Sequence, residues 1–152
     1  MSGGRPGEHS QGISQMMTVR CYLGPSKIEG LGVFCHDPIK KGDVIWLFDA
    51  RFDRLIPVED IDSAPEQMRE FLDRYSYPMI GYPGQMVLDV DEGRFMNHSD
   101  SPNTDFTAPD AGYALRDIPA GEELTCDYAS FTVGEIVFQP PRHRVANGAT
   151  AA

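Results

Sequence analysis

The sequence is poor in cysteine, and its few cysteines are not placed to form bridges or to bind metal. Cys21, Cys35 and Cys126 are odd in number, widely separated, and without a C-x-x-C pair. This spacing predicts neither a disulfide framework nor a cysteine-rich zinc site, and the histidines also lack metal-ligand spacing. We expect no metal, and a reducing compartment such as the cytoplasm.

Basic residues are also scarce. The chain has 13 lysines and arginines against 23 aspartates and glutamates, a net charge of −10. A protein that binds nucleic acid directly needs a basic surface for the phosphates, so a basic protein or peptide is the easier partner. Residues 1–15 are polar and contain no apolar run, unlike a signal peptide or a membrane anchor. We therefore expect no direct contact with nucleic acid and no membrane association.

Turn-forming residues, by contrast, are plentiful. The 15 glycines and 12 prolines among 152 residues favour a single domain of short strands, so the expected fold class is mainly β. We expect this domain to span residues 17–138. A disordered N-terminal arm over residues 1–16 would precede it, and a disordered tail over residues 139–152 would follow it.

Alternating or continuous apolar residues predict several strands. The predicted strands span 17–23, 33–35, 44–48 and 86–88, with a hairpin between 105–108 and 112–116. Residues 39–44 and 118–124 share one pattern, an apolar residue, then a glycine, an acidic residue and a strand, which indicates two similar turn-to-strand units. The acidic bend at 89–93 lacks the ligand set of a calcium loop and is expected to be a solvated turn.

One helix is well signalled. Ser63 with Glu66 three residues later matches a capping box, which predicts a helix starting there. Met68, Phe71 and Leu72 recur at helical spacing, so we expect these three side chains to face the core.

Two common catalytic patterns are incomplete. Gly30-x-Gly32 lacks the third glycine of a dinucleotide-binding fingerprint and precedes a strand, so it predicts a turn that closely approaches either a ligand or another strand. His98-Ser99-Asp100 has the residue types of a nucleophilic triad, but three consecutive side chains cannot form the relay. We therefore expect neither a Rossmann site nor a hydrolase.

Two polar stretches remain as candidates for function. Residues 94–103 combine Asn, His and Ser around a proline and predict a shaped loop, while residues 122–128 run from an acidic turn through a short strand to Tyr128. With Gly30 to Phe34, these stretches form an ordered series, R-F-x-N-H-S with Pro102-Asn103 and then G-E-E-L-T-C-D-Y. This series resembles the SET-domain protein lysine methyltransferases.

The resemblance implies a compact SET-type β-clip fold of several small sheets with one short helix and a knot-like crossing near the C-terminus. Such threading is rare among proteins. In that crossing the Asn97-His98 segment would meet the Tyr128 segment. The cofactor implied is S-adenosylmethionine, on the opposite face of the domain from a narrow channel for the substrate lysine. No cysteine follows Cys126, so this would be a short, zinc-free form, similar to bacterial or viral members.

The motif match also implies roles for individual residues. Tyr128 would be catalytic, and the substrate channel would include Phe106, Cys126 and Phe131. The implied cofactor-binding residues are Gly30, Leu31, Gly32, Tyr77, Arg94, Asn97 and His98, with Tyr75 as the alternative to Tyr77. Neither Phe106 nor Cys126 carries a hydroxyl at the positions that limit methylation in the family, so we expect di- or trimethylated product.

The resemblance implies methyl transfer from S-adenosylmethionine to a lysine of a basic protein or peptide, with histone-like and ribosomal proteins as candidates. Many members of the family carry a cysteine cluster after the catalytic tyrosine that closes the lysine channel, and here no cysteine follows Cys126. Residues 131–138 or the second subunit of a homodimer would therefore have to complete the channel. Two alternatives stay open. One is a SET-like protein-binding module with weak or no turnover, and the other is an enzyme that acts on a small amine.

Overall fold

The computed structural model describes residues 16–79, 81–108 and 110–130. The predicted arm (apart from residue 16), the predicted tail, and Phe131 with the rest of 131–138 lie outside the described residues. No helix in the described part of the chain is long and apolar enough to cross a membrane.

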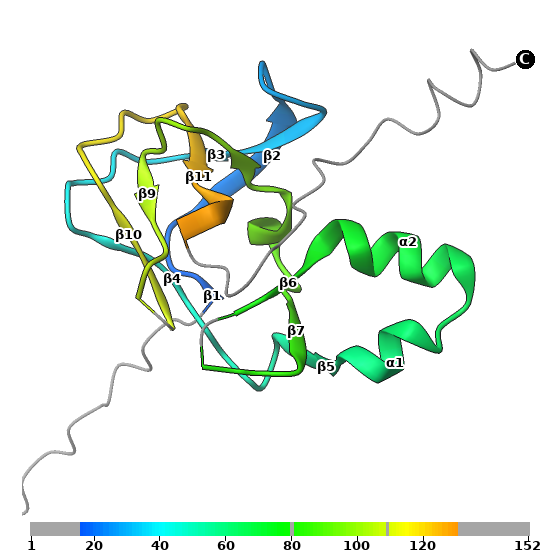
Figure 1. Ribbon diagram of the computed structural model, residues 1–152. Coiled ribbons are helices and arrows are strands. Elements are labelled where there is room, and N and C mark those ends of the chain that lie inside the picture. The colour runs from blue at the N-terminus through cyan, green and yellow to red at the C-terminus, as the bar shows by residue number, and fades with distance from the viewer. Residues whose placement is uncertain (1–15, 80, 109, 131–152) are drawn as a thin grey trace, which may run out of the picture.

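The described strands form three small sheets (Figure 1). The first contains, in order, β1 (Met16–Met17), β4 (Val44–Leu47), β10 (Ala111–Ala114) and β9 (Thr104–Asp105). The second contains β2 (Cys21–Pro25), β3 (Leu31–Cys35), β11 (Glu123–Cys126) and β8 (Asn97–His98). The third contains β5 (Arg54–Pro57), β7 (Gln85–Leu88) and β6 (Ser76–Pro78). The mainly β expectation is confirmed.

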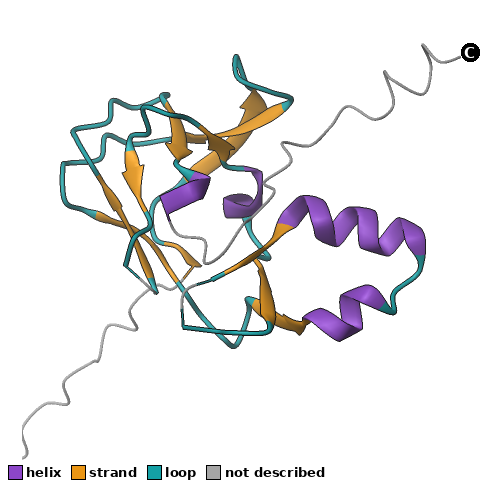
Figure 2. Cartoon of the chain, viewed as in Figure 1, coloured by secondary structure: helices purple, strands orange, loops and turns teal. Residues whose placement is uncertain are grey.

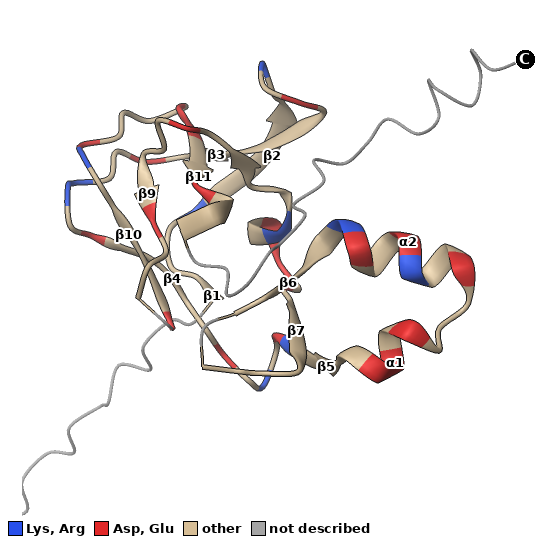
Figure 3. Cartoon of the chain, in the orientation of Figure 1, with Lys and Arg blue, Asp and Glu red and all other residues tan. Residues whose placement is uncertain are grey.

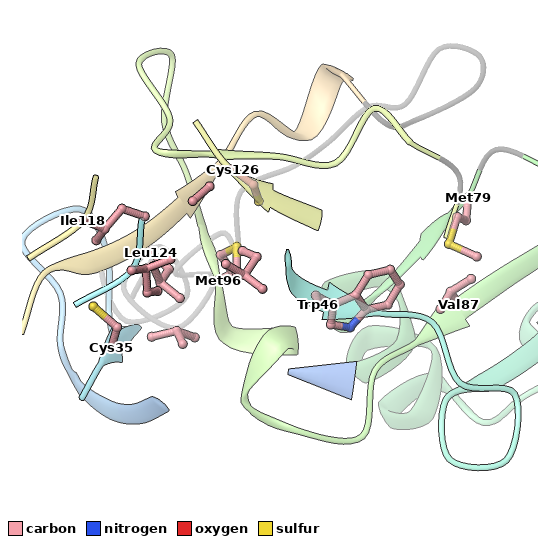
Figure 4. Packing of buried hydrophobic residues seen from close by; sticks show 12 residues of the cluster. Cys35, Trp46, Met79, Val87, Met96, Ile118, Leu124 and Cys126 are labelled. Carbon is pink, nitrogen blue, oxygen red and sulfur yellow. The ribbon is translucent and has the colours of Figure 1, made fainter. Parts of the chain in front are cut away.

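The core lies where the three sheets meet (Figure 4). Val33 of β3 stands opposite Leu124 of β11 in an antiparallel pair, and both side chains are fully buried. Ile45 of β4 and Val87 of β7 bring the other two sheets into the same cluster. Burying each such side chain stabilises the fold by roughly 1.5–3 kcal/mol, which explains why short strands suffice.

The two similar turn-to-strand units pair with each other. Ile39 and Ile118 form an antiparallel bridge in which each backbone N–H donates to the other residue's carbonyl, at 2.9 and 2.8 Å. Gly42 and Gly121 follow at equivalent places, with φ of +88° and +82°, a conformation that favours glycine. The two units lead into β4 and β11, which belong to different sheets.

Helices project from one side of the molecule, and here the sequence prediction was partly wrong (Figure 2). Helix α2 spans Glu66–Tyr75, but Ser63 is not its cap, because Ser63 ends the unpredicted helix α1 (Val58–Asp62). Of the three side chains expected in the core, Leu72 is buried, whereas Met68 and Phe71 are 48% and 37% exposed. Helical spacing identified the helix correctly. It did not predict which side chains are buried, because only a narrow strip of the surface of α2 packs against the rest of the domain.

Candidate active site

Two segments almost thirty residues apart meet in a short parallel pair. In β8 and β11, Asn97 lies beside Thr125 and His98 beside Cys126. Asn103 holds the pair from the side: its Oδ1 accepts from the Thr125 backbone N–H at 2.8 Å, and its Nδ2 donates to the Glu123 carbonyl at 2.8 Å. The Asn103 amide thus makes the hydrogen bonds to β11 that the backbone of a neighbouring strand would make. Because these bonds satisfy its polar atoms, the amide is stable although it is buried.

Tyr128 begins the 3₁₀ helix η2 (Tyr128–Ser130) directly beyond β11. Its ring stacks on the His98 imidazole, with centroids 5.3 Å apart, and its hydroxyl donates to the backbone carbonyl of Met96. Burial raises the pKa of the Tyr128 phenol above its ordinary value, and Cys126, Glu29 and Glu123 add to the rise. The phenol therefore keeps its proton and serves as an oriented hydrogen-bonding group.

Hydrogen-bond partners assign the tautomer of His98. The backbone N–H of Tyr128 donates to Nδ1 at 3.2 Å, so this nitrogen carries no proton, and Nε2 then donates to Asp100 at 2.9 Å. Ser99 has a separate role, because its Oγ accepts from the backbone N–H of Ser101 at 3.1 Å. The geometry agrees with rejecting a nucleophilic relay.

The loop at residues 26–32 is hydrogen-bonded to the side chain of Asn97. The Asn97 Nδ2 donates to the carbonyls of Glu29 and Leu31, at 3.1 and 3.0 Å, and to Glu123 Oε1 at 2.9 Å. Leu31 itself is 49% exposed. Asn97, His98 and the glycine-containing loop thus form one surface on the outer side of Tyr128.

A cavity of about 570 Å³, its open mouth included, also borders Tyr128. Its lining comes from all three sheets, α2 and η1 (Glu92–Phe95): Met17, Trp46, Arg74, Tyr75, Ser76, Tyr77, Asp89, Gly93, Arg94, Met96, Phe106, Cys126 and Tyr128. Five of the thirteen lining residues are aromatic: Trp46, Tyr75, Tyr77, Phe106 and Tyr128. Tyr128 therefore borders both this cavity and the Asn97–His98 surface.

Two neighbours shape the inner wall of the cavity. A Cβ on Gly112 would lie 2.5 Å from a ring carbon of Phe106, so the glycine makes room for that ring, which also packs 5.7 Å from Trp46 between centroids. Cys126 is buried, and burial raises the pKa of its thiol well above the ordinary value, so the sulfur is a neutral, apolar wall atom.

A buried carboxyl group lies on the opposite wall. The Tyr77 hydroxyl is 3.2 and 3.3 Å from the two oxygens of Asp89, which is 5% exposed. Burial, with Asp53 and Asp91 nearby, raises the pKa of Asp89 to about 8. The prediction of a solvated turn at 89–93 was wrong at this residue, because its side chain points into the cavity wall and accepts from Tyr77 of the neighbouring strand β6.

Two buried donors lack a hydrogen-bond partner within the described part of the chain: Trp46 Nε1 and Arg94 Nε. Both residues line the cavity. The Arg94 guanidinium lies 4.9 Å from the Phe95 ring centre and 6.0 Å from that of Tyr75. Unpaired buried donors are uncommon in folded proteins and are satisfied by water or by a bound ligand.

Comparison with known proteins places this geometry in a family. The model of the SET domain matches residues 30–129, which include the glycine loop, both polar stretches and Tyr128. The chain belongs to the SET domain family.

Two curated relatives contain this SET domain within far longer proteins. The histone-lysine N-methyltransferase mes-2 of Caenorhabditis elegans is 31% identical over 141 residues, 84% of this chain and 17% of the relative. The variant-silencing SET domain-containing protein of Plasmodium falciparum (isolate 3D7) is 31% identical over 118 residues, 66% of this chain and 4% of the relative. The chain thus spans less than a fifth of either.

Solved structures share the fold. A Plasmodium falciparum protein, crystallised as a candidate histone methyltransferase, has a TM-score of 0.53 and 24% identity, covering 84% of this chain and 100% of that one. An apo form of Chaetomium thermophilum Polycomb Repressive Complex 2 has a TM-score of 0.60 and 21% identity, covering 80% of this chain and 16% of that one. The expected SET-type fold of small sheets is confirmed, with α1 as an additional helix.

The structure divides the predicted site residues of this SET domain into two groups. His98 contacts Tyr128, and Asn97 joins it to the glycine-containing loop, in which Gly30 and Leu31 are accessible and Gly32 is buried. Tyr77 and Arg94, which are also predicted to bind the cofactor, line the cavity together with the predicted channel residues Phe106 and Cys126, and so does the alternative, Tyr75. Phe131 lies outside the described residues.

Three residues that touch this SET domain's site were not singled out from the sequence. Asp89 was assigned to a turn, Trp46 to the predicted strand at 44–48, and Glu123 was included in the 122–128 stretch without a role of its own. One feature of the sequence does point toward Glu123. Gly32 predicts a close approach by another group, and in the structure that group is the Glu123 carboxylate.

Proposed function

We propose that this SET domain is a protein-lysine methyltransferase that uses S-adenosylmethionine. The observation that carries the proposal is the place of Tyr128, between an aromatic cavity and the Asn97–His98 surface, with its hydroxyl fixed on the Met96 carbonyl. Two ligands that enter from the two sides would meet at this hydroxyl. Membership in the family supports methyl transfer to lysine at the general level.

The described residues fit S-adenosylmethionine on the outer surface. That cofactor combines an apolar adenosine face with polar ends and a sulfonium charge, and it supplies an electrophilic methyl group when bound. The exposed Leu31 offers apolar contact, and Asn97 and His98 offer polar contact. The carboxylates of Glu29 and Glu123 act on the Tyr128 phenol, so a positive charge beside it would be favoured.

The cavity fits the substrate side chain. A lysine must lose its proton before it can accept a methyl group, and its ordinary pKa is about 10.4. Loss of water inside the cavity and the guanidinium groups of Arg74 and Arg94 in its wall both disfavour the charged ammonium, which lowers this pKa. The Tyr128 hydroxyl donates to Met96, so its oxygen can still accept a hydrogen bond from the amine and orient the nitrogen lone pair.

Charge supports a basic substrate. The net charge is −10, and acidic residues outnumber basic ones on the projecting helices (Figure 3): Glu59, Asp60, Asp62, Glu66, Glu70 and Asp73 against Arg69 and Arg74. Two relatives or structural neighbours are named as histone methyltransferases. We propose a histone-like or ribosomal protein as substrate, a cytoplasmic location, and a homodimer or residues 131–138 as the cover of the channel. Because Phe106 and Cys126 leave the cavity without hydroxyls at their positions, we propose di- or trimethylation.

A methyl-transfer screen tests the proposal. The chain is incubated with labelled S-adenosylmethionine and a panel of histone-like and ribosomal proteins, and products are resolved by mass spectrometry. We expect transfer to lysine, and a loss of kcat of about 100-fold in Tyr128→Phe with cofactor affinity within about twofold, because orientation of the amine is lost while the ring stack stays. The matched control is Tyr113→Phe, on the exposed side of β10.

Each outcome discriminates between functions. Absence of cofactor binding by calorimetry would contradict the proposal altogether. Cofactor binding without transfer to any protein in the panel would favour the protein-binding module, and transfer to free amines alone would favour a small-molecule enzyme. Full activity of Tyr128→Phe would refute the role given to its hydroxyl.

A further inference from the structure

Glu123 contacts the loop at residues 26–32 and Asn97, which belong to the outer surface. In the described contacts it touches neither the cavity nor the Tyr128 hydroxyl. It stands in β11 opposite Phe34 of β3, and its carboxylate reaches back toward the loop at residues 26–32. Ser26 Oγ lies 2.9 Å from both carboxylate oxygens, and Asn97 Nδ2 donates to Oε1 at 2.9 Å. One carboxylate thus joins a loop near the start of the chain to the polar stretch at residues 94–103.

Ser26 extends this connection into the loop backbone. Its Oγ accepts from the N–H groups of Ile28 and Glu29, at 2.9 and 3.3 Å, while its hydroxyl proton is donated to Glu123. The Ser26 backbone N–H also donates to the Gly30 carbonyl at 2.9 Å. The loop conformation therefore depends on a hydroxyl that Glu123 orients.

Gly32 is shaped by the same carboxylate. A Cβ at this position would lie 2.2 Å from Glu123 Oε1 and 2.7 Å from its Cδ, distances at which something must move. Gly32 has no positive φ, unlike Gly30 at +48°, so a side chain at position 32 is disfavoured by the Glu123 carboxylate that it would displace and not by the backbone conformation. Gly32 therefore closely approaches the side chain of a neighbouring strand, which is one of the two alternatives that the sequence left open.

Glu123 also decides which way the Asn97 amide points. The Nδ2 group faces three acceptors, the carbonyls of Glu29 and Leu31 and the Glu123 carboxylate. Because all three are acceptors, the NH₂ end must face the loop and the Oδ1 end must face away from it. A charged acceptor makes a stronger hydrogen bond than a neutral one, so the carboxylate is the main determinant of this orientation.

We infer that Glu123 is a positioning residue for the methyl donor: it fixes the 26–32 loop and the Asn97 amide, and thereby sets cofactor affinity without taking part in the transfer step. The inference rests on the proposed function. It assigns a role to the second glutamate of the Glu122-Glu123 pair that differs from that of the first, whose carboxylate pairs with Arg116 and Asn103 instead.

The test compares Glu123→Ala, Glu123→Gln and the matched control Glu122→Gln, which removes the same charge from the adjacent residue. We expect Glu123→Ala to weaken binding of S-adenosylmethionine, measured by calorimetry, about 10-fold or more, with kcat at saturating cofactor within about threefold of the parent. Glu123→Gln keeps an acceptor for Asn97 and should recover part of the affinity. Glu122→Gln should bind within about twofold of the parent.

A second readout is independent of turnover. In ¹⁵N NMR spectra of the cofactor-free protein, the side-chain amide signals of Asn97 should move in Glu123→Ala and stay in place in Glu122→Gln. If Glu123→Ala does not fold, Gly32→Ala provides the same displacement from the opposite side and should weaken binding to a similar degree.

Three results would overturn the inference. Unchanged cofactor affinity in folded Glu123→Ala refutes it while leaving the proposed function intact, and a fall in kcat equal to the fall in kcat/KM refutes the claim that the transfer step is untouched. No cofactor binding by the parent protein would refute the proposed function and this inference with it.

Discussion

The buried carboxyl group of Asp89 makes a stability prediction that can be worked out in numbers. Its pKa rises from 3.8 to about 8 on folding, because of burial and of the nearby carboxylates of Asp53 and Asp91. The folded state then binds more protons than the unfolded state between these two values, so stability falls as pH rises through this window. At 1.36 kcal/mol per pKa unit, ionising Asp89 in the folded protein costs up to about 6 kcal/mol.

The variant Asp89→Asn removes this penalty. Its side-chain oxygen can still accept the hydrogen bond from Tyr77, and the neutral amide is not repelled by the carboxylates of Asp53 and Asp91. About 2 kcal/mol of the penalty is already present at pH 5.5 and all of it at pH 8.5, so the stability advantage of Asp89→Asn over the parent should grow by about 3 kcal/mol between these pH values.

Urea unfolding at pH 5.5 and 8.5 measures this difference, with Asp73→Asn on the exposed face of α2 as the control. Taking the difference between variants cancels the titration of groups that do not interact with Asp89. An advantage of Asp89→Asn that is the same at both pH values would refute the reasoning, and so would a control variant that shows an equal change.

Two further predictions concern the site walls. Because burial raises the pKa of Tyr128, the rate of methyl transfer should show no fall near pH 10, where a free tyrosine ionises; a descending limb there that Tyr128→Phe abolishes would contradict this. Gly112→Ala places a Cβ against the Phe106 ring and should lower the free energy of unfolding by about 1–3 kcal/mol, measured by thermal or urea unfolding. Adding Phe106→Leu should restore part of that loss, and no restoration would show that the strain lies elsewhere.

The sequence was sufficient where a short motif fixes both local shape and partner. Tyr128 and Asn97 were named from stretches whose residue types suit a loop beside a short strand, and the parallel pair of β8 and β11 brings those stretches together. Turn residues likewise identified the two units at 39–44 and 118–124.

Sequence reasoning was insufficient where burial or partners come from distant parts of the chain. The residues next to Asp89 in the sequence do not indicate that it is buried. It follows β7, whose neighbours in the sheet are β5 and β6, and helices α1 and α2 separate these two strands in the chain. Ser26 and Glu123 are 97 positions apart, and only the sheet order brings them into contact. At Ser63 the local pattern gave a wrong prediction. The sequence matches a capping box, but the residues before Ser63 already form helix α1, which Ser63 ends.

The position of β11 has a consequence for how this protein can lose activity. The strand is an inner one, bonded to β3 along one edge and to β8 along the other, and it leads directly into Tyr128. A tyrosine on a peripheral loop could be released by a local opening that costs little free energy. Here Tyr128 follows a strand that is paired on both edges, so we expect an opening that releases it to disrupt this pairing and to cost more free energy than the opening of a peripheral loop.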